Sequence, residues 1–190
     1  MSTQRIVVIG GSAGGIEALL ILAAALPASF PAPVCVVIHT SPHTLPGRLS
    51  ALISRAGVVD ASDARDGESL TPGHVYVAPA GHHLLVNRGA VRLTRGPKEN
   101  HVRPAIDPLF RSAAETYGTA TVGVVLTGGL DDGTAGLWAI KEAGGVAIVQ
   151  DPDDALFPSM PQSAAKHVRV DHLVALQEIA PLLTRIVNGP

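Results

Sequence analysis

The feature that most limits the fold of this chain is a series of short, almost wholly apolar runs separated by helical patterns. The runs lack the alternation of polar and apolar residues that marks a strand with one solvent-facing side. They are typical of strands buried on both faces of a parallel sheet. The runs are Arg5–Ile9, Val34–Ile38, Thr121–Leu126 and Val146–Gln150. We therefore predict an α/β fold: a doubly wound, mainly parallel sheet with helices on both faces.

Helical patterns and one hairpin occupy the segments between these runs. Val75–Ala78 reads as a further short strand, and Leu84–Asn87 and Ala90–Thr94 flank Arg88-Gly89, a dipeptide that suits a hairpin turn. Asp107 is a candidate N-cap of the helix expected after it. Helices are expected at Ile16–Leu26, Leu45–Arg55, Pro108–Tyr117, Gly133–Ala143 and Leu173–Val187. The sheet is thus expected to carry one added β-hairpin.

Composition narrows the class of protein and of partner. A length of 190 residues favours one domain. The formal net charge is −2, with acids and bases interleaved and no basic stripe, so nucleic acid is not expected as a partner. The single cysteine, Cys35, excludes an internal disulfide. The longest apolar stretch, Ile16 to Leu26, falls well short of a membrane span. We expect a soluble, cytoplasmic protein without membrane insertion.

The segment after the first apolar run, Gly10-Gly11-Ser12-Ala13-Gly14, places a serine in a glycine-rich turn between a strand and a helix. In that context Gly-x-Ser-x-Gly is the nucleophile-elbow pattern, and the amides that open the next helix favour developing negative charge. The same residues also fit a phosphate-binding loop with Ser12 as a helix cap, or a purely structural turn. A dinucleotide-binding Gly-x-Gly-x-x-Gly is excluded because neither register has the required glycines.

Two more polar residues follow buried runs. His39 comes directly after the second run and Asp132 follows the third. Because ligands of open α/β sheets bind outside the carboxyl ends of the strands, these side chains and Ser12 can share a site. His39 would then be the general base and Asp132 the group that orients the imidazole. The alternatives are a capped or solvent-facing histidine, and helix capping by Asp131 or Asp132.

The conjunction of the three residues favours a serine hydrolase. Their chain order, Ser-His-Asp, differs from the Ser-Asp-His order of the common α/β-hydrolases, so the chain is expected to lie outside that superfamily. Other histidines compete with His39 but form no compact metal-binding motif. They are His43, His74, His82, His83, His101, His167 and His172.

Ordered motifs along the chain resemble the catalytic domain of the CheB-type chemotaxis receptor protein-glutamate methylesterases. The resemblance extends from about Ile6 to His172. The segments that carry it are Val7–Gly15, Val37–His39, Val75–Pro79, His101–Ala114, Gly123–Gly128, Asp132–Gly136 and Met160-Pro161. Enzymes of this family hydrolyse glutamate γ-methyl esters on the cytoplasmic helical domain of chemoreceptors, and many also deamidate particular glutamines there. The resemblance implies the same activity and partner for this chain, with no cofactor and no metal.

The resemblance also assigns roles to residues. Ser12 matches the nucleophile, His39 the base and Asp132 the orienting acid. Gly129 matches the position whose backbone amide contributes to the oxyanion hole, and the Ala13 amide is expected to assist it. A further segment matches a loop that borders the substrate cleft, with the residues His101, Arg103 and Pro104.

The chain departs from the family pattern at three points. Ala13 stands where the family often has threonine, and Gly128-Gly129-Leu130 where it often has Gly-Met-Gly. The familiar chemotaxis enzyme also carries an N-terminal phospho-receiver domain, whereas this chain starts at the catalytic strand. We therefore expect residues 1–190 to form a single methylesterase catalytic domain without a receiver domain. A separate response regulator or methyltransferase is then a candidate partner.

Two other functional classes are weighed against the methylesterase. One is a nucleotide- or phosphate-binding α/β module that uses Gly10–Gly15 at the helix N-terminus. The other is a catalytically silent, receptor-binding scaffold. The presence of Ser12, His39 and Asp132 together argues against the scaffold, because a protein that had lost its activity need not keep all three.

Overall fold

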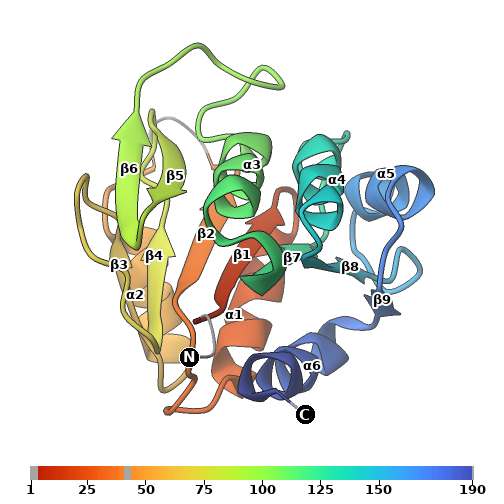
Figure 1. The fold of residues 1–190 in the computed structure, drawn as a ribbon, viewed down its shortest axis with the longest axis horizontal. Helices are drawn as coiled ribbons and strands as arrows, with labels where there is room; N and C mark the ends of the chain where they lie inside the picture. The colour runs from red at the N-terminus through yellow and green to blue at the C-terminus, as the bar shows by residue number, and fades with distance from the viewer. Residues whose placement is uncertain (1–3, 41–43, 190) are drawn as a thin grey trace.

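A seven-stranded sheet forms the centre of the protein (Figure 1). The computed structural model describes residues 4–40 and 44–189, so His43 lies outside the described residues. The strand order is β3-β4-β2-β1-β7-β8-β9, and every neighbouring pair is parallel. The strands are β1 (Ile6–Gly11), β2 (Val34–Ile38), β3 (Asp60–Asp63), β4 (His74–Val77), β7 (Thr121–Val125), β8 (Val146–Gln150) and β9 (His172–Val174).

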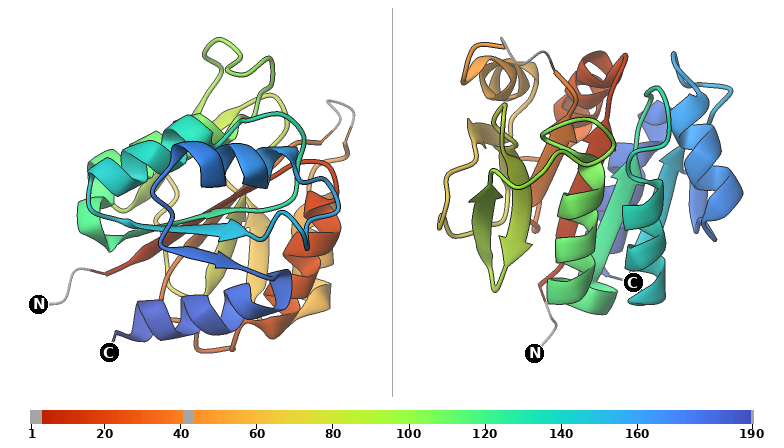
Figure 2. Two further views of the ribbon diagram at one scale, coloured as in Figure 1. Left: turned by 90° about the vertical axis from the view of Figure 1, so that its right-hand side faces the viewer. Right: turned by 90° about the horizontal axis from the view of Figure 1, so that it is seen from above.

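Helices cover both faces of this sheet, as the left-hand view of Figure 2 shows. On one face lie α1 (Gly15–Ala25), α2 (Arg48–Ala56) and α6 (Leu176–Asn188). On the other lie α3 (Ile106–Tyr117), α4 (Thr134–Glu142) and α5 (Ser159–His167). The antiparallel hairpin of β5 (His83–Asn87) and β6 (Ala90–Thr94) packs against α3 on this second face. The predicted doubly wound α/β fold with one added hairpin is therefore confirmed.

The central strands have continuous apolar runs because each strand contributes side chains to two hydrophobic cores, one on each face of the sheet. In β1, Val7 and Ile9 pack into the core shared with α1, α2 and α6, whereas Ile6 and Val8 pack into the core shared with α3, α4 and α5. All four side chains are completely buried. Successive side chains of a strand point to opposite faces, so a strand covered on both sides has to be apolar at every position.

Strand β1 lies where the sheet order reverses. The chain passes from β1 to β2 on one side and later returns to β7 on the other, with β1 paired to both. In doubly wound folds the crevice at such a switch point, at the carboxyl ends of the strands, is where ligands bind. Residues that follow β1, β2 and β7 are therefore brought to one place.

Several elements differ from the sequence predictions. Strands β3 and β9 and helix α5 were not predicted, and the expected helix Leu173–Val187 is wrong at its start. His172–Val174 pairs with β8 as an edge strand, and α6 begins at Leu176. The helix expected from Leu45 begins at Arg48, after Gly47 in the left-handed region at φ 75°.

Asp107 is not the N-cap of its helix. Helix α3 begins at Ile106 and its N-cap is Ala105, which places Asp107 inside the first turn. The Asp107 carboxylate binds a different helix, as described below.

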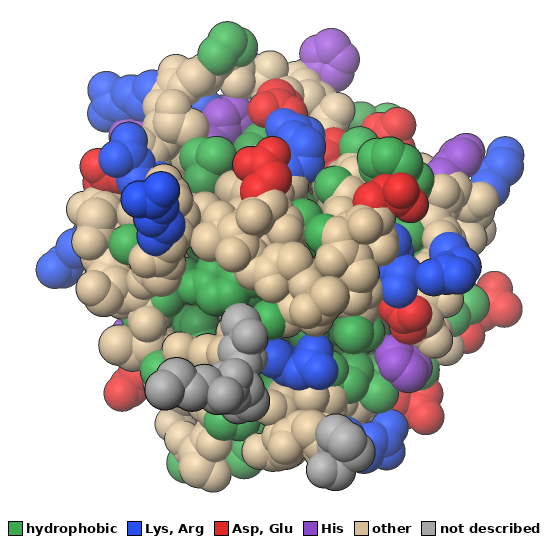
Figure 3. Space-filling view, viewed as in Figure 1, with side chains coloured by type: hydrophobic (Ala, Val, Ile, Leu, Met, Phe, Trp, Pro, Cys, Tyr) green, Lys and Arg blue, Asp and Glu red, His purple; other side chains and the backbone are tan. Residues whose placement is uncertain are grey.

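The surface charge and the length of the helices relate to the predictions on nucleic-acid binding and membrane insertion. On the face seen in Figure 3, acidic and basic side chains intermingle and no field of one sign dominates. Among the described residues, every helix is too short or too polar to cross a lipid bilayer.

Candidate active site

Ser12 is the first residue after β1. Its amide donates to the Thr127 carbonyl at 3.0 Å, which ties the turn to the segment that follows β7. Gly14, at φ 72°, is the N-cap of α1, and no side chain caps this helix. The Ser12 hydroxyl therefore does not act as the helix cap that one alternative required. It lies 3.1 Å from Nδ1 of His39 instead.

His39 directly follows β2, the parallel neighbour of β1. Gly11 and Ile38 are paired in the ladder, and the His39 amide donates to the Gly11 carbonyl at 3.0 Å. The imidazole reaches Ser12 through Nδ1 and the Asp132 Oδ2 atom through Nε2, the latter at 2.7 Å. Its side chain is only 16% exposed. A neutral ring with its proton on Nε2 donates to Asp132 and accepts from the serine hydroxyl, so both contacts are satisfied.

Asp132 is 3% exposed and its carboxylate is fully hydrogen-bonded. Oδ2 accepts from His39 Nε2 and from the Ile106 amide, each at 2.7 Å. Oδ1 accepts from Asn100 Nδ2 at 2.7 Å and from the Asp107 amide at 3.1 Å. Burial alone would raise the pKa of this carboxyl, but the four hydrogen bonds outweigh burial and hold the pKa below its ordinary value. Asp132 thus faces His39 and also binds the amino-terminal amides of α3.

A second buried carboxylate, Asp107, lies beside Asp132. Its Oδ1 accepts from the Gly136 amide at 2.6 Å and the Gly133 amide at 3.1 Å, at the start of α4. Its Oδ2 accepts from Asn100 Nδ2 at 2.8 Å. Burial raises the pKa of Asp107 above its ordinary value, and the neighbouring Asp132 charge adds to this; the Gly136 and Asn100 hydrogen bonds offset only part of it. The start of α4 needs Gly133, whose φ is 95°.

Two backbone amides beside Ser12 can bind an anion. The Gly128 amide is occupied, because it donates to the Phe157 carbonyl at 2.9 Å. Within residues 4–40 and 44–189, the amides of Ala13 and Gly129 have no hydrogen-bond acceptor. The Cβ position of Gly128 would lie 2.9 Å from Ser12 Cβ, so the segment that carries Gly129 packs directly against the serine. Both amides therefore remain candidates for the oxyanion hole.

Two hollows meet at His39. One, of about 310 Å³, is lined by His39, Thr40 and the loop that contains His101, Arg103 and Pro104. Lys98 lines the same hollow, so its wall carries several basic side chains. The structure thus brings the three predicted cleft residues together beside the imidazole.

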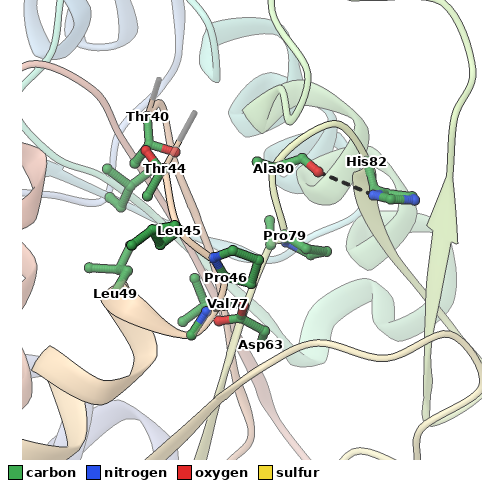
Figure 4. Close-up of a pocket in the computed structure, with 13 residues that line it drawn as sticks. Thr40, Thr44, Leu45, Pro46, Leu49, Asp63, Val77, Pro79, Ala80 and His82 are labelled. Carbon is green, nitrogen blue, oxygen red and sulfur yellow. Dashed lines mark hydrogen bonds between the residues drawn. The ribbon is translucent and has the colours of Figure 1, made fainter. Parts of the chain in front are cut away.

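The second hollow, of about 670 Å³, lies over α1 and α2 and is mainly apolar. It is lined by Ile16, His39, Thr40, Thr44, Leu45, Arg48, Leu49 and Leu52. A smaller cavity of about 230 Å³ opens beyond Thr40, between the start of α2 and the ends of β2 and β4 (Figure 4). In that view Leu45, Leu49, Val77 and Pro79 surround it.

Sequence reasoning missed two residues that shape this site. Asn100 bridges both carboxylates, and its only signal was its place in the Pro- and Gly-rich loop before His101. Thr127 follows β7, and its hydroxyl donates to the Ala13 carbonyl at 3.1 Å and accepts from the Phe157 amide at 2.8 Å. In the part of the chain that the structure describes, no three His, Cys, Asp or Glu side chains form a metal-binding group.

Comparison with known proteins gives a consistent result. The family model described as CheB methylesterase matches residues 7–183. A protein-glutamate methylesterase/protein-glutamine glutaminase 2 of Anaeromyxobacter dehalogenans is 38% identical over 184 residues, which are 97% of this chain and 54% of that protein. A relative from Leptospira interrogans, named provisionally for the same two activities, is 38% identical over 95% of this chain and 93% of its own length.

The three-dimensional comparison covers nearly the whole chain. The crystal structure of the Thermotoga maritima CheB methylesterase catalytic domain superposes with a TM-score of 0.91 at 35% sequence identity. The match covers 96% of this chain and 98% of that domain. The family model and these relatives all span nearly the full described chain, and the chain therefore belongs to the CheB methylesterase family.

Proposed function

We propose that this protein is a protein-glutamate methylesterase that hydrolyses the γ-methyl esters of glutamates on chemoreceptors. The observation that carries the proposal is the continuous hydrogen-bonded chain from Ser12 through His39 to Asp132, in a member of the CheB methylesterase family. The order of contacts matches a nucleophile, its base and the group that orients the base.

In the first half-reaction, Ser12 Oγ attacks the γ-carbonyl carbon of the methylated glutamate and its proton passes to Nδ1 of His39. Asp132 stabilises the imidazolium through Nε2. The tetrahedral intermediate then collapses, the bond to the methoxy oxygen breaks, and His39 returns the proton so that methanol leaves. The glutamyl group remains as an ester on Ser12.

The oxyanion of the tetrahedral intermediate is assigned to the amides of Ala13 and Gly129. Ala13 follows Ser12 in its turn, and Gly129 follows Gly128, which packs against Ser12; neither amide donates a hydrogen bond to another described residue. Ala13 also precedes α1, whose amino end favours negative charge. The methionine that the family often has in this region is replaced by Gly129, but a backbone donor is retained. Each such donor is typically worth about 3–4 kcal/mol of transition-state stabilisation.

In the second half-reaction, a water molecule gives a proton to His39 and its oxygen attacks the acyl carbon. His39 then protonates Ser12 Oγ as that bond breaks, which releases glutamate and restores the free hydroxyl. The same steps acting on a glutamine side chain expel ammonia in place of methanol. We therefore include glutamine deamidation as a second reaction of the same site, in keeping with the double names of the relatives.

The substrate-binding surface is assigned to the two hollows that meet at His39. The apolar hollow over α1 and α2 suits an apolar stripe of the substrate, and the loop with His101, Arg103 and Pro104 borders the ester from the other side. The helical cytoplasmic domain of a methylated receptor is the proposed partner. A separate response regulator or methyltransferase remains a further candidate, and residues 1–190 are proposed to act as one catalytic domain.

The test is the release of methanol from methyl-esterified receptor fragments. Wild type is expected to release methanol and Ser12→Ala to release none above the uncatalysed rate, with the same thermal melting curve. Unmethylated fragments are the control for substrate, and ammonia release from glutamine-bearing fragments tests deamidation. Equal methanol release by the folded Ser12→Ala variant would overturn the proposal.

The alternative of a nucleotide- or phosphate-binding module makes the opposite predictions. It requires thermal stabilisation by nucleotides through Gly10–Gly15, and it leaves the Ser12 hydroxyl without covalent reactivity. A melting-temperature rise with nucleotides, together with no reaction of Ser12 with a fluorophosphonate, would favour that module over the methylesterase.

A further inference from the structure

The side-chain amide of Asn100 stands between the two buried carboxylates of the site. Its nitrogen carries two N–H bonds, and it lies 2.7 Å from Asp132 Oδ1 and 2.8 Å from Asp107 Oδ2. One N–H can therefore be given to each carboxylate. Asn100 thus joins Asp132, which faces His39, to Asp107, which binds the start of α4.

Asn100 makes the shorter of the two hydrogen bonds that hold Oδ1 of Asp132. Oδ2 is held by His39 Nε2 and the Ile106 amide, both at 2.7 Å. Oδ1 is held by Asn100 at 2.7 Å and by the longer contact from the Asp107 amide at 3.1 Å. Without the Asn100 amide, rotation of the carboxylate about its Cβ–Cγ bond would be restrained on the Oδ1 side by that longer contact.

Electrostatics favours the same bridge. Two carboxylates that share one buried site repel each other, and the repulsion is reduced when a donor lies between them. The Asn100 amide is that donor for both groups. A displaced or reoriented Asp132 would lose the short contact with His39, and the imidazole would then lose its alignment with Ser12.

The loop around Asn100 is built to present this side chain. Asn100 has φ 50°, in the left-handed region that asparagine tolerates better than most residues. Glu99 and Val102 pair across it through their backbones at 3.2 and 2.9 Å. The Glu99 carboxylate also binds Arg111 of α3 at 2.6 Å, which anchors the loop to the helix that carries Asp107.

We propose that Asn100 is a positioning residue of the methylesterase, which sets the orientation of the Asp132 carboxylate by bridging it to Asp107. The inference rests on the proposed function for its catalytic readout only. The competing explanation is that asparagine is needed at this position merely to allow the left-handed turn.

Two variants separate these explanations. Asn100→Asp keeps the shape and the tolerance of the left-handed region but replaces the donor by an acceptor. Asn100→Gly keeps the backbone freedom and removes the side chain. If the turn alone matters, both variants keep their activity. If the bridge matters, both lower kcat by roughly 10-fold or more at little change in KM, because the loss of a hydrogen bond to a charged group is involved.

The matched controls are Asn87→Asp and Asn87→Gly. Asn87 is exposed and ends β5, on the hairpin, so the same chemical changes are made away from the carboxylates. These variants are expected to keep kcat within about 2-fold of wild type, since surface changes are usually near neutral. Thermal melting of all four variants verifies that each is folded before its kinetics are compared.

A second readout does not depend on methylesterase activity. The proton on Nε2 of His39, in its 2.7 Å contact with Asp132, is expected to give a downfield NMR resonance, which would be assigned by its loss in His39→Ala. It is expected to shift and to exchange faster with water in both Asn100 variants, and to stay as in wild type in both Asn87 variants. A failure of the proposed function removes methanol release from wild type but leaves this comparison intact.

The outcomes decide the proposal. A lower kcat in both Asn100 variants, together with the changed His39 resonance, supports the bridge. Folded Asn100→Asp and Asn100→Gly proteins with wild-type kcat and an unchanged resonance would overturn it. A raised KM with unchanged kcat would also contradict it, because it would assign Asn100 to substrate binding instead of to the orientation of Asp132.

Discussion

Asp132 and Asp107 bind the amino-terminal amides of each other's helices: Asp132 binds the start of α3, which carries Asp107, and Asp107 binds the start of α4, which follows Asp132. Asp132, just before α4, accepts from the Ile106 and Asp107 amides at the start of α3. Asp107, in the first turn of α3, accepts from the Gly133 and Gly136 amides at the start of α4. The exchange locks the two helices together at the carboxyl edge of the sheet. It also gives Asp132 a fixed place from which to face His39.

The first prediction concerns the stability that Asp107 provides. Asp107→Ala leaves the buried amides of Gly133 and Gly136 without their acceptor, and Asn100 with one carboxylate instead of two. We expect a loss of about 1–3 kcal/mol in the free energy of unfolding, measured by urea denaturation. Asp131→Ala is the control, because Asp131 is exposed. Equal stability of the two variants would show that the reciprocal contacts contribute nothing.

The second prediction concerns the pH dependence of stability at Asp132. Its pKa in the folded chain lies below the ordinary value. An acid of this kind stabilises the fold above its unfolded pKa of about 3.9, and the contribution is lost as the pH falls through the lower folded pKa. The difference in unfolding free energy between wild type and Asp132→Asn should therefore be largest near neutral pH and narrow below about pH 4.

Urea titrations of both proteins across this pH range check the prediction, with Asp131→Asn as the control. A difference that stays constant from neutral to acidic pH would mean that the Asp132 charge is not what the hydrogen bonds stabilise.

The third prediction tests the oxyanion role of Gly129 without removing a side chain. Gly129→Pro deletes the backbone N–H, whereas Gly129→Ala keeps it, and no atom lies within 4 Å of the added Cβ position. We expect Gly129→Ala to stay near wild-type activity and Gly129→Pro to lose about 10²–10³-fold in kcat. Melting curves verify that both are folded. Equal kcat in the two variants would exclude the amide from the oxyanion hole.

The fourth prediction concerns the cleft loop. Arg103 donates from Nη1 to the Arg95 and Gly96 carbonyls at 3.1 and 2.7 Å, which holds the loop beside His39. Arg103→Ala should raise KM for the protein substrate more than it lowers kcat. Arg92→Ala is the control, because Arg92 is exposed and its guanidinium contacts Asp66 on the hairpin side. A fall in kcat alone would assign Arg103 to the chemistry instead of to the cleft.

The burial of each strand decided whether its sequence predicted it. The central strands were predictable because they are buried on both faces and their apolar runs are continuous. β3 was not, because it lies at the sheet edge and its residues, Asp60 to Asp63, are mostly polar and none is fully buried. Helix α5 carries Pro161 and few apolar residues, so its periodicity is weak. β9 has only three residues.

The site follows the same division. The sequence predicted a shared site for Ser12, His39 and Asp132 because each follows a buried strand, and the topology brings the ends of those strands together. Asn100 lies in an irregular loop, where no periodicity or motif indicates which side chain turns inward. The sequence left open whether Asp131 or Asp132 caps the helix that follows. The structure gives α4 the N-cap Gly133 without a side-chain cap, and the Asp132 carboxylate contacts His39 and the Ile106 amide of α3 instead.

The reactivity of Ser12 is the central claim, and covalent labelling tests it most directly. Wild type, His39→Ala and Ser12→Ala are treated with a fluorophosphonate, and the adduct is located by peptide mass spectrometry. We expect a single adduct on Ser12, formed at least about 100-fold more slowly in His39→Ala, because the base that removes the hydroxyl proton is missing. A Ser12 that stays unmodified in wild type, or that reacts equally fast without His39, would contradict it.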